Sequence, residues 1–390
     1  MKVAFVAPFF GAGAAGGAEA ECRQTAIRLA AQGVEVDVFT TCILDLTHDW
    51  NVNYHRQGES REDGMTVRRF RVEYADLAPF FRLNERVLKG EILSEAEEKQ
   101  FIAMHIYSIG LCRSLAAAWR DYDWVVLIPY LFGTTCFASM LCAPKAVLIP
   151  CLHDEPYARM RVYAGLFDRV AKIVFHTRAE LELAQRLYGI PAGKGLLLGE
   201  GIETEFESSA ERFRKRHGIE RPFVLYAGRK SETKNVHTLI RDFALYRQRH
   251  AGDLALVLIG PGHLPVPRGM EEHILDLGFV TDQDKKDAYS AAAVFCQPSL
   301  NESFSIVIME SWICGRPCLV HGGCAVTREH VVRAGGGLYY ENAAEFGKCL
   351  EFLLANGDMA RRMGSAGRTY VRSNFAWDRI IQRYREEVFV

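Results

Sequence analysis

The stretch Asn301-Glu302-Ser303-Phe304-Ser305-Ile306-Val307-Ile308-Met309-Glu310 decides the fold that we expect for this chain. It follows an apolar segment at residues 293–297 that has the character of a buried strand. It then runs into an apolar segment that Gly315-Arg316-Pro317 ends. This pattern predicts a strand, a loop and a short helix, with the loop at the carboxyl edge of a parallel sheet. Open α/β sheets bind ligands at that edge, so we expect this loop to line a ligand site.

The residue types in this loop suit a phosphate that carries a sugar. Free N–H groups at the helix start, with the helix dipole behind them, favour an anion. Ser303 and Ser305 are small, and their hydroxyls add donors. Glu302 precedes the helix, and Glu310 within it leans back toward the helix start, where carboxylates suit sugar hydroxyls. The same residues also fit a helix with one capping and one solvated glutamate, because short motifs have low specificity.

Composition limits the protein class. The 390 residues suit two domains, and 49% hydrophobic with 24% charged residues predicts a globular core rather than disorder. A formal net charge of -1 argues against binding nucleic acid by bulk charge. The eleven cysteines are scattered without a CxxC pair, which favours reduced core cysteines in a cytosolic protein. The amino-terminal apolar run is too short for a signal peptide, and no run is long enough to cross a membrane. We therefore expect a cytoplasmic protein, with contact to the inner face of a membrane left open.

The first residues predict a βαβ unit with a glycine-rich turn. A buried strand at 2–8 leads into a loop at 9–17, a helix at 18–32 and a second strand at 34–39. The letters Gly11-x-Gly13-x-x-Gly16 match the dinucleotide fingerprint, but several residues separate them from the strand end. The motif is therefore weak evidence for NAD, and the glycines also fit a mobile surface loop.

Further strands are predicted at residues 66–72, 124–128, 146–150 and 172–175, and their alternation with helical segments predicts parallel pairing. His153 and Asp154 directly follow the strand at 146–150, which is the position for ligand contact. A simple turn with a helix cap fits these two residues as well.

Residues 79–120 look helical and amphipathic, with aromatic and basic side chains together. Such a stripe suits a membrane surface or the binding of an acceptor, but it more often packs against a core. Residues 43–64 are polar and mixed, and we expect an irregular excursion there.

A second α/β series follows a crossing at residues 191–222. Its strands are predicted at 221–228, 254–259, 274–280, 293–297, 318–321 and 337–340, with a closing helix at 377–388. Arg229, Lys230 and Lys234 stand between the first of these strands and a helix at about 235–250. Cations at a helix start oppose its dipole, so their placement is easier to understand if an anion sits there. Solvated side chains are the alternative.

These motifs, taken in order, resemble the nucleotide-sugar domain of retaining glycosyltransferases of family 4, which have the GT-B fold. The matching elements are Gly228-Arg229, Lys234-Asn235, Leu277-Gly278-Phe279-Val280, and Glu302 with Glu310, which seven residues separate. The ordered set covers most of residues 222–340 and is far more specific than any one element. In the first half, Gly16-Gly17-Ala18-Glu19 and His153-Asp154 resemble the family's glycine loop and active-site histidine region.

The resemblance implies an α/β architecture of two Rossmann-like, doubly wound domains facing a central cleft. Residues 1–195 would form the acceptor domain and residues 196–374 the nucleotide-sugar domain. Residues 375–390 would form a helix that packs back on the first domain.

The resemblance also implies roles for single residues. Arg229 and Lys234 would neutralise the diphosphate leaving group, and Glu302 would contact the donor sugar. His153 would lie near the transferred sugar. Gly16 and Gly17 would close over the phosphates, and the backbone of Val280 would hold the base. The backbone of residues Ser303, Phe304, Ser305 and Ile306 would donate to the phosphates. Glu310 would accept hydrogen bonds from the ribose hydroxyls.

One departure stands out, because the family loop usually reads glycine-phenylalanine-glycine where this chain has Ser303-Phe304-Ser305. The loop must then avoid positive φ or tolerate it at some cost.

The implied activity is transfer of a sugar from a nucleotide-diphosphate sugar to an acceptor hydroxyl, with retained configuration and with neither a metal nor a cofactor. The acceptor would be a glycan, a lipid-linked molecule or a small molecule, in cell-surface polysaccharide or glycoconjugate synthesis by analogy. The base, the sugar and the acceptor stay open. Two alternatives remain, namely another GT-B enzyme such as a phosphorylase or an epimerase, and a catalytically silent nucleotide-binding subunit.

Overall fold

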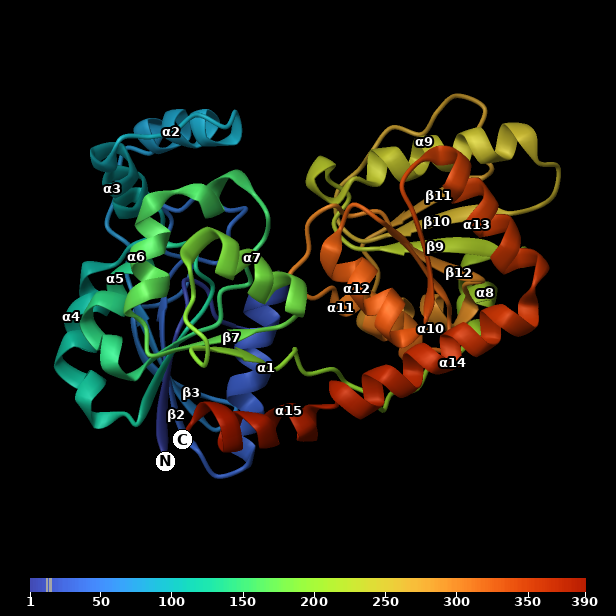
Figure 1. Cartoon of the computed structure of the whole chain (residues 1–390). Helices are drawn as coiled ribbons and strands as arrows, with labels where there is room; N and C mark the ends of the chain where they lie inside the picture. The colour runs from blue at the N-terminus through green and yellow to red at the C-terminus, as the bar shows by residue number, and fades with distance from the viewer. Residues whose placement is uncertain (12, 14–15) are drawn as a thin grey trace. The chain divides into compact units, whose positions relative to one another are not determined.

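Two mainly parallel sheets organise the chain, each with helices packed against it (Figure 1). The computed structural model describes residues 1–11, 13 and 16–390. Unit 1 comprises Met1–Gly201 and Asp378–Val390, and unit 2 comprises Ile202–Trp377. The chain therefore crosses between the units a few residues after each of the predicted boundaries, 195/196 and 374/375. Next to the crossings, the Ile202 N–H donates to the Phe375 carbonyl at 2.7 Å.

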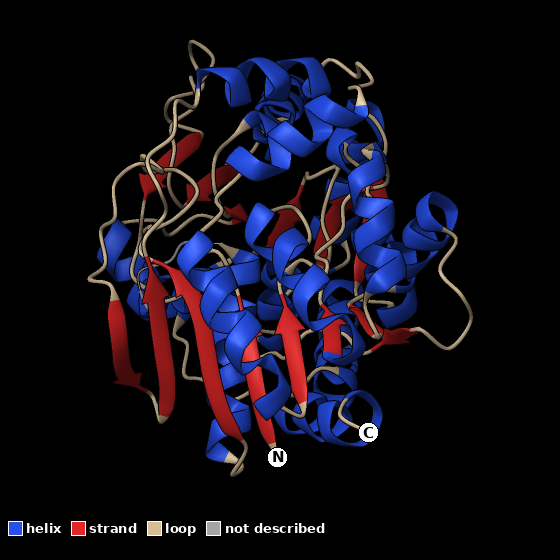
Figure 2. Cartoon of the chain, turned by 90° about the vertical axis from the view of Figure 1, so that its left-hand side faces the viewer, coloured by secondary structure: helices blue, strands red, loops and turns tan. Residues whose placement is uncertain are grey.

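Unit 1 contains an eight-stranded sheet in the order β3-β4-β2-β1-β5-β6-β7-β8. All neighbours pair in parallel except β3 and β4. On the central strand β1, Phe5 lies opposite Val38 on one side and Val126 on the other. The strands, red in Figure 2, are β1 (Lys2–Val6), β2 (Glu35–Thr41), β3 (Gly58–Glu62), β4 (Met65–Phe70), β5 (Trp124–Leu127), β6 (Ala146–Leu148), β7 (Lys172–Phe175) and β8 (Gly195–Leu197).

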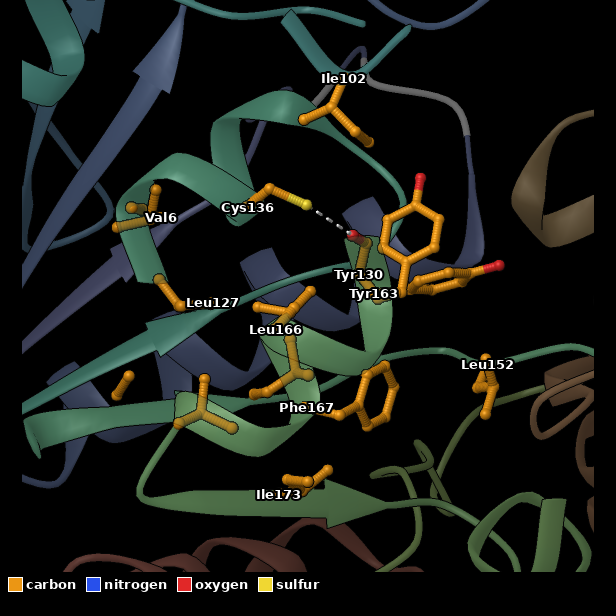
Figure 3. Close-up of a cluster of buried hydrophobic side chains, with 14 of the residues drawn as sticks. Val6, Ile102, Leu127, Tyr130, Cys136, Leu152, Tyr163, Leu166, Phe167 and Ile173 are labelled. Atoms are coloured by element: carbon orange, nitrogen blue, oxygen red, sulfur yellow. Dashed lines mark hydrogen bonds between the residues drawn. The ribbon is translucent and has the colours of Figure 1, made fainter. Parts of the chain in front are cut away.

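Alternate residues of β1 pack on opposite faces of this sheet. Ala4 and Val6 join a large buried cluster with side chains from the helices that follow β4, and Figure 3 shows part of that cluster. The helices of unit 1 that precede β8 are α1 (Gly17–Ala31), α2 (Ala78–Leu88), α3 (Glu95–Met104), α4 (Ile109–Ala118), α5 (Gly133–Cys142), α6 (Arg161–Arg169) and α7 (Arg178–Tyr188).

The amphipathic region divides into α2, α3 and α4. On α2, Phe80, Leu83 and Val87 are buried in the core of unit 1, which is what the packing interpretation predicts. Phe81 and Leu88 lie on the outer side of the same helix, 56% and 55% exposed. Among the described residues, no single helix is long and apolar enough to cross a membrane, although Glu95–Met104 and Ile109–Asp121 pass that test as a pair bent by 89°.

Two strands of unit 1 depart from the sequence-based expectation. The polar excursion at residues 43–64 contains the edge strand β3, and β8 lies in the segment that was expected to be a domain crossing. The strand β3 escapes prediction because its five residues, GESRE, are polar and largely exposed and so show no apolar alternation.

The last helix, α15 (Trp377–Arg383), continues into a π-helical turn at Tyr384–Val388, and residues from Asp378 onward belong to unit 1. Arg383 donates to the carbonyls of Leu197 and Leu198, at 2.7 and 2.8 Å. The Lys172 ammonium donates to the carbonyl of Val388 at 2.7 Å. These bonds attach the carboxyl terminus to β7 and to the residues at the end of β8.

Unit 2 contains a six-stranded, fully parallel sheet in the order β11-β10-β9-β12-β13-β14. Its strands are β9 (Phe223–Ala227), β10 (Ala255–Ile259), β11 (Ile274–Gly278), β12 (Val294–Gln297), β13 (Cys318–His321) and β14 (Gly337–Tyr340). Its helices are α8 (Ala210–His217), α9 (Val236–Arg249), α10 (Asp282–Ala291), α11 (Ile306–Ile313), α12 (Ala325–Ala334), α13 (Ala343–Ala355) and α14 (Gly357–Asn374). Both units are thus Rossmann-like α/β domains, which confirms the predicted fold class.

The cysteines behave as the composition predicts. All eleven are free thiols, and seven of them are buried (Cys22, Cys42, Cys136, Cys142, Cys296, Cys318 and Cys324).

Candidate active site

The strand order of unit 2 reverses at β9, which has β10 on one side and β12 on the other. Loops at the carboxyl ends of such strands form the ligand crevice of open α/β sheets. The turn after β9 carries Gly228 to Lys234, and the loop after β12 carries residues 298–305. The side-chain amide of Asn235 donates to the Pro298 carbonyl at 3.0 Å. This bond joins the turn after β9 to the loop after β12. The sequence motifs before α9 and α11 therefore meet at one place in the fold.

Lys234 and Glu302 are in direct contact at this place. The Lys234 Nζ lies 2.8 Å from Glu302 Oε1, and the same oxygen accepts from Gln297 Nε2 at 3.0 Å. Lys234 is one-third exposed, so its ammonium remains accessible to a ligand. A carboxylate and an ammonium at the start of a helix can bind a sugar hydroxyl and a phosphate side by side.

The Ser303-Phe304-Ser305 loop tolerates positive φ at one residue. Ser305 precedes α11 with φ 75° and ψ 71°, in the left-handed region. Gln297 Nε2 lies 3.4 Å from Ser305 Oγ and so contacts both Ser305 and Glu302. Gln297 is only 3% exposed. Sequence reasoning missed it, although a polar residue at the end of the apolar run VFCQ is a detectable signal.

Phe304 faces away from solvent. Its ring is 1% exposed and packs edge-on against His330 and Phe375, with ring centroids 5.1 and 5.0 Å apart. Its side chain anchors the loop to the core, which leaves only its backbone for a ligand. Ile306 begins α11, whose first amides lack partners within the helix.

Glu310 is held by two side chains of α10. Lys285 Nζ lies 2.7 Å from Oε1, and the Tyr289 hydroxyl donates to Oε2 at 2.8 Å. Burial lowers the pKa of Lys285, but the carboxylates of Glu310 and Asp282 outweigh it and raise that pKa. Each carboxylate oxygen can accept a further bond, so Glu310 can still accept a hydrogen bond from a ligand hydroxyl. Sequence reasoning missed both partners, which stand four residues apart on α10.

The cations after β9 have different environments. Arg229 is exposed, and its carbonyl accepts from the Tyr226 hydroxyl at 2.8 Å. Lys230 is buried, and its ammonium lies 2.7 Å from Asp276 and donates to the Gly260 carbonyl. Burial raises the pKa of Asp276, but Lys230 and other donors outweigh it and lower that pKa. Grouping Lys230 with the ligand-facing cations is therefore wrong, because it forms a structural ion pair.

Val280 lies two residues beyond the end of β11, which stops at Gly278 rather than at the predicted residue 280. Val280 itself is half-buried. The adjacent Phe279 ring is 81% exposed.

Unit 1 holds the remaining predicted residues. Gly16 has extended backbone with φ 171° and precedes Gly17, the first residue of α1. Part of the predicted glycine loop, residues 12, 14 and 15, lies outside the described residues. His153 follows β6 and is half-buried. Asp154 forms a surface ion pair with Arg159 at 2.6 Å, so its neighbourhood is solvent-facing.

One group among residues 1–11, 13 and 16–390 brings metal-ligating atoms within 4.8 Å of one another, namely Glu21, Cys151 and His176. His176 Nε2 lies 2.6 Å from Glu21 Oε1. Two ligands on one tetrahedral zinc would stand about 3.3 Å apart, given zinc–nitrogen and zinc–oxygen distances of about 2.0–2.2 Å. The shorter distance is that of a charge-assisted hydrogen bond, which joins these two side chains directly.

Family models match both halves of the chain. "Glycosyl transferase 4-like domain" matches residues 16–201, and "Glycosyl transferases group 1" matches residues 208–370. A D-inositol 3-phosphate glycosyltransferase of Nocardiopsis dassonvillei is 26% identical over 336 residues, covering 79% of this chain and 74% of the relative.

Solved structures share the fold over the whole chain. The Anabaena protein Alr3699/HepE, in complex with UDP-glucose, has a TM-score of 0.72 at 17% identity, covering 100% of this chain and 99% of that one. Sucrose-phosphate synthase from Thermosynechococcus elongatus has a TM-score of 0.70 at 19% identity, covering 99% and 98%.

Proposed function

This chain is a family-4-like glycosyltransferase of the GT-B fold, and on that basis we propose that it moves a sugar from a nucleotide-diphosphate sugar to an acceptor hydroxyl with retained configuration. The observation that supports this proposal best is the Lys234–Glu302 contact at the point where the strand order of unit 2 reverses. It sets a cation for phosphate and a carboxylate for sugar beside the start of α11.

The proposed chemistry centres on the charge that the leaving group gains. As the bond between the sugar's anomeric carbon and the phosphate oxygen breaks, negative charge grows on the diphosphate. Lys234, Arg229 and the amides of residues 303–306 meet that charge, and such prearranged groups stabilise the transition state. The two cations supply the charge that a metal ion supplies in other enzymes.

Retention requires the acceptor to attack on the face that the diphosphate leaves. The acceptor oxygen bonds to the anomeric carbon while its proton passes to the departing phosphate oxygen, so the step is balanced without a further reactant. Glu302 orients the donor sugar through its hydroxyls, and Glu310, held by Lys285 and Tyr289, accepts from the ribose. Val280 holds the base through its backbone.

In unit 1, we assign His153 and the Gly16-Gly17 turn to donor recognition as well. We propose that the acceptor is a glycan, a lipid-linked molecule or a small molecule, and that the product belongs to the synthesis of cell-surface polysaccharides or glycoconjugates. The base is open, and UDP-glucose is the first probe because the Anabaena structure holds it.

The test begins with thermal shifts in the presence of UDP, GDP, dTDP and ADP. The stabilising base is then supplied as a labelled nucleotide sugar with a panel of acceptors. We expect release of nucleoside diphosphate that depends on acceptor, and a product whose anomeric configuration, read by NMR, matches the donor. Binding without turnover would point to a silent subunit. Formation of a sugar phosphate from inorganic phosphate would point to a phosphorylase, and isomerised sugar without an acceptor would point to an epimerase.

A further inference from the structure

Three buried ionisable side chains of unit 1 have no part in the chemistry proposed above. Glu21, His176 and Glu180 are 3%, 2% and 1% exposed. Glu21 lies in the first half of α1, His176 directly follows β7, and Glu180 lies in the first turn of α7. Burying charged groups costs free energy unless partners compensate, so their contacts show what they hold in place.

The three side chains form one connected network. His176 Nε2 is 2.6 Å from Glu21 Oε1, and His176 Nδ1 is 3.8 Å from Glu180 Oε2. The Glu180 carboxylate accepts two backbone N–H groups, from Leu152 at 2.7 Å and from His176 at 2.7 Å. The Cys151 thiol donates to Glu21 Oε2 at 3.6 Å, which closes the connection between α1 and the loop after β6.

The network joins the two parts of unit 1 that carry predicted site residues. Cys151 and Leu152 directly precede His153, and Glu21 stands about one turn after Gly17. Cys151 has φ 52°, in the left-handed region that a residue with a side chain rarely adopts. It has contacts on both sides, through its own thiol and through the Leu152 amide, and these contacts hold the loop in this conformation.

Apolar residues of similar size often replace buried ion pairs without loss of stability. A connected polar network adds geometric definition that apolar packing lacks. We propose that Glu21, His176 and Glu180 are positioning residues that set His153 relative to the Gly16-Gly17 turn for the transfer step. This inference rests on the proposed function, because it assigns the network a role in that reaction.

The experiment compares Glu180→Gln with Glu182→Gln. A glutamine side chain has the volume of glutamate but only one oxygen, so it cannot accept both the Leu152 and the His176 amides. Glu182 lies two residues further along α7 and is exposed, which makes its variant a matched control. Glu21→Gln serves as a second variant if Glu180→Gln does not fold, because it changes the other end of the network.

We expect kcat of Glu180→Gln to fall about tenfold or more, while the Kd of UDP, which unit 2 is proposed to bind, changes less than about twofold. Hydrogen exchange of the peptide that contains residues 151–153 should accelerate in the same variant. Glu182→Gln should match the wild type in all three measurements. A folded Glu180→Gln or Glu21→Gln protein with wild-type kcat would overturn the proposal, and so would a loss of kcat without faster exchange at residues 151–153.

The two proposals fail in distinguishable ways. Absence of turnover in the wild-type protein across donors and acceptors would contradict the proposed function. Wild-type turnover that survives disruption of the network would contradict only the positioning role.

Discussion

Replacing Lys234 by methionine separates the proposed role of this residue in turnover from its role in stability. The substitution keeps the apolar stem and removes the ammonium that lies 2.8 Å from Glu302. If that ammonium stabilises charge on the leaving diphosphate, its loss should lower kcat about 10²–10³-fold, the effect of removing one prearranged donor at a developing charge. That factor corresponds to about 2.7–4 kcal/mol of transition-state stabilisation.

The effect on folding should be much smaller. Lys234 is one-third exposed, so solvent screens its pair with Glu302, and exposed pairs contribute at most about 1 kcal/mol. Gln297 still donates to Glu302 after the substitution, so the carboxylate keeps one partner. In a unit of this size, about 1 kcal/mol lowers Tm by about 2–4 °C.

Steady-state release of UDP from UDP-glucose with a productive acceptor measures the first effect, and thermal unfolding measures the second. Lys215→Met is the matched control, because Lys215 is an exposed lysine on α8 of the same unit. Turnover of Lys234→Met at the wild-type rate would contradict a role for this ammonium in catalysis. An equal loss of activity in Lys215→Met would contradict it too, since the effect would then reflect net charge rather than position.

Three further outcomes follow from other contacts. Lys230→Met should destabilise the protein by about 3 kcal/mol in urea unfolding, because it removes the buried ammonium that pairs with Asp276. An unchanged unfolding midpoint would show that the ion pair contributes nothing to stability. Gln297→Leu should lower kcat about fivefold at constant UDP affinity, since one hydrogen bond that orients Glu302 contributes about 1 kcal/mol. A wild-type kcat in this variant would exclude a role for Gln297 in orienting Glu302. Burial by itself lowers the pKa of His176, but the neighbouring carboxylates raise it to about 10, above its unfolded value. The stability that His176 adds is therefore complete below about pH 6.5 and lost as pH rises to about 10. Tm should fall across that window, and it should fall less in His176→Gln; an equal fall in both proteins would contradict a charged His176.

The positions of the candidate site residues were predictable because their motifs follow strands. Gly228-Arg229 and the loop with Glu302 each come after an apolar run, and parallel strands place such loops at one edge of the sheet. That Lys234 would contact Glu302 also requires β9 and β12 to be neighbours. The resemblance to family 4 supplied that adjacency through the expected fold, whereas the residue pattern alone did not.

The partners of these residues were not predictable, because they depend on which helices pack together. Lys285 and Tyr289 reach Glu310 only because α10 packs beside α11. Likewise, Glu21 and His176 meet across 155 residues of chain. Lys230 and Arg229 are adjacent cations in sequence, and only the burial of Lys230 against Asp276 distinguishes them. Local pattern contains no information on such contacts.

The proposed function depends on unit 2 binding a diphosphate with Lys234, Arg229 and the amides at the start of α11. A crystal structure of the full chain with bound UDP would show whether it does. We expect phosphate oxygens within about 2.7–3.2 Å of Lys234 Nζ, of the Arg229 guanidinium and of backbone nitrogens in residues 303–306. UDP bound elsewhere, with those groups left in solvent, would contradict it.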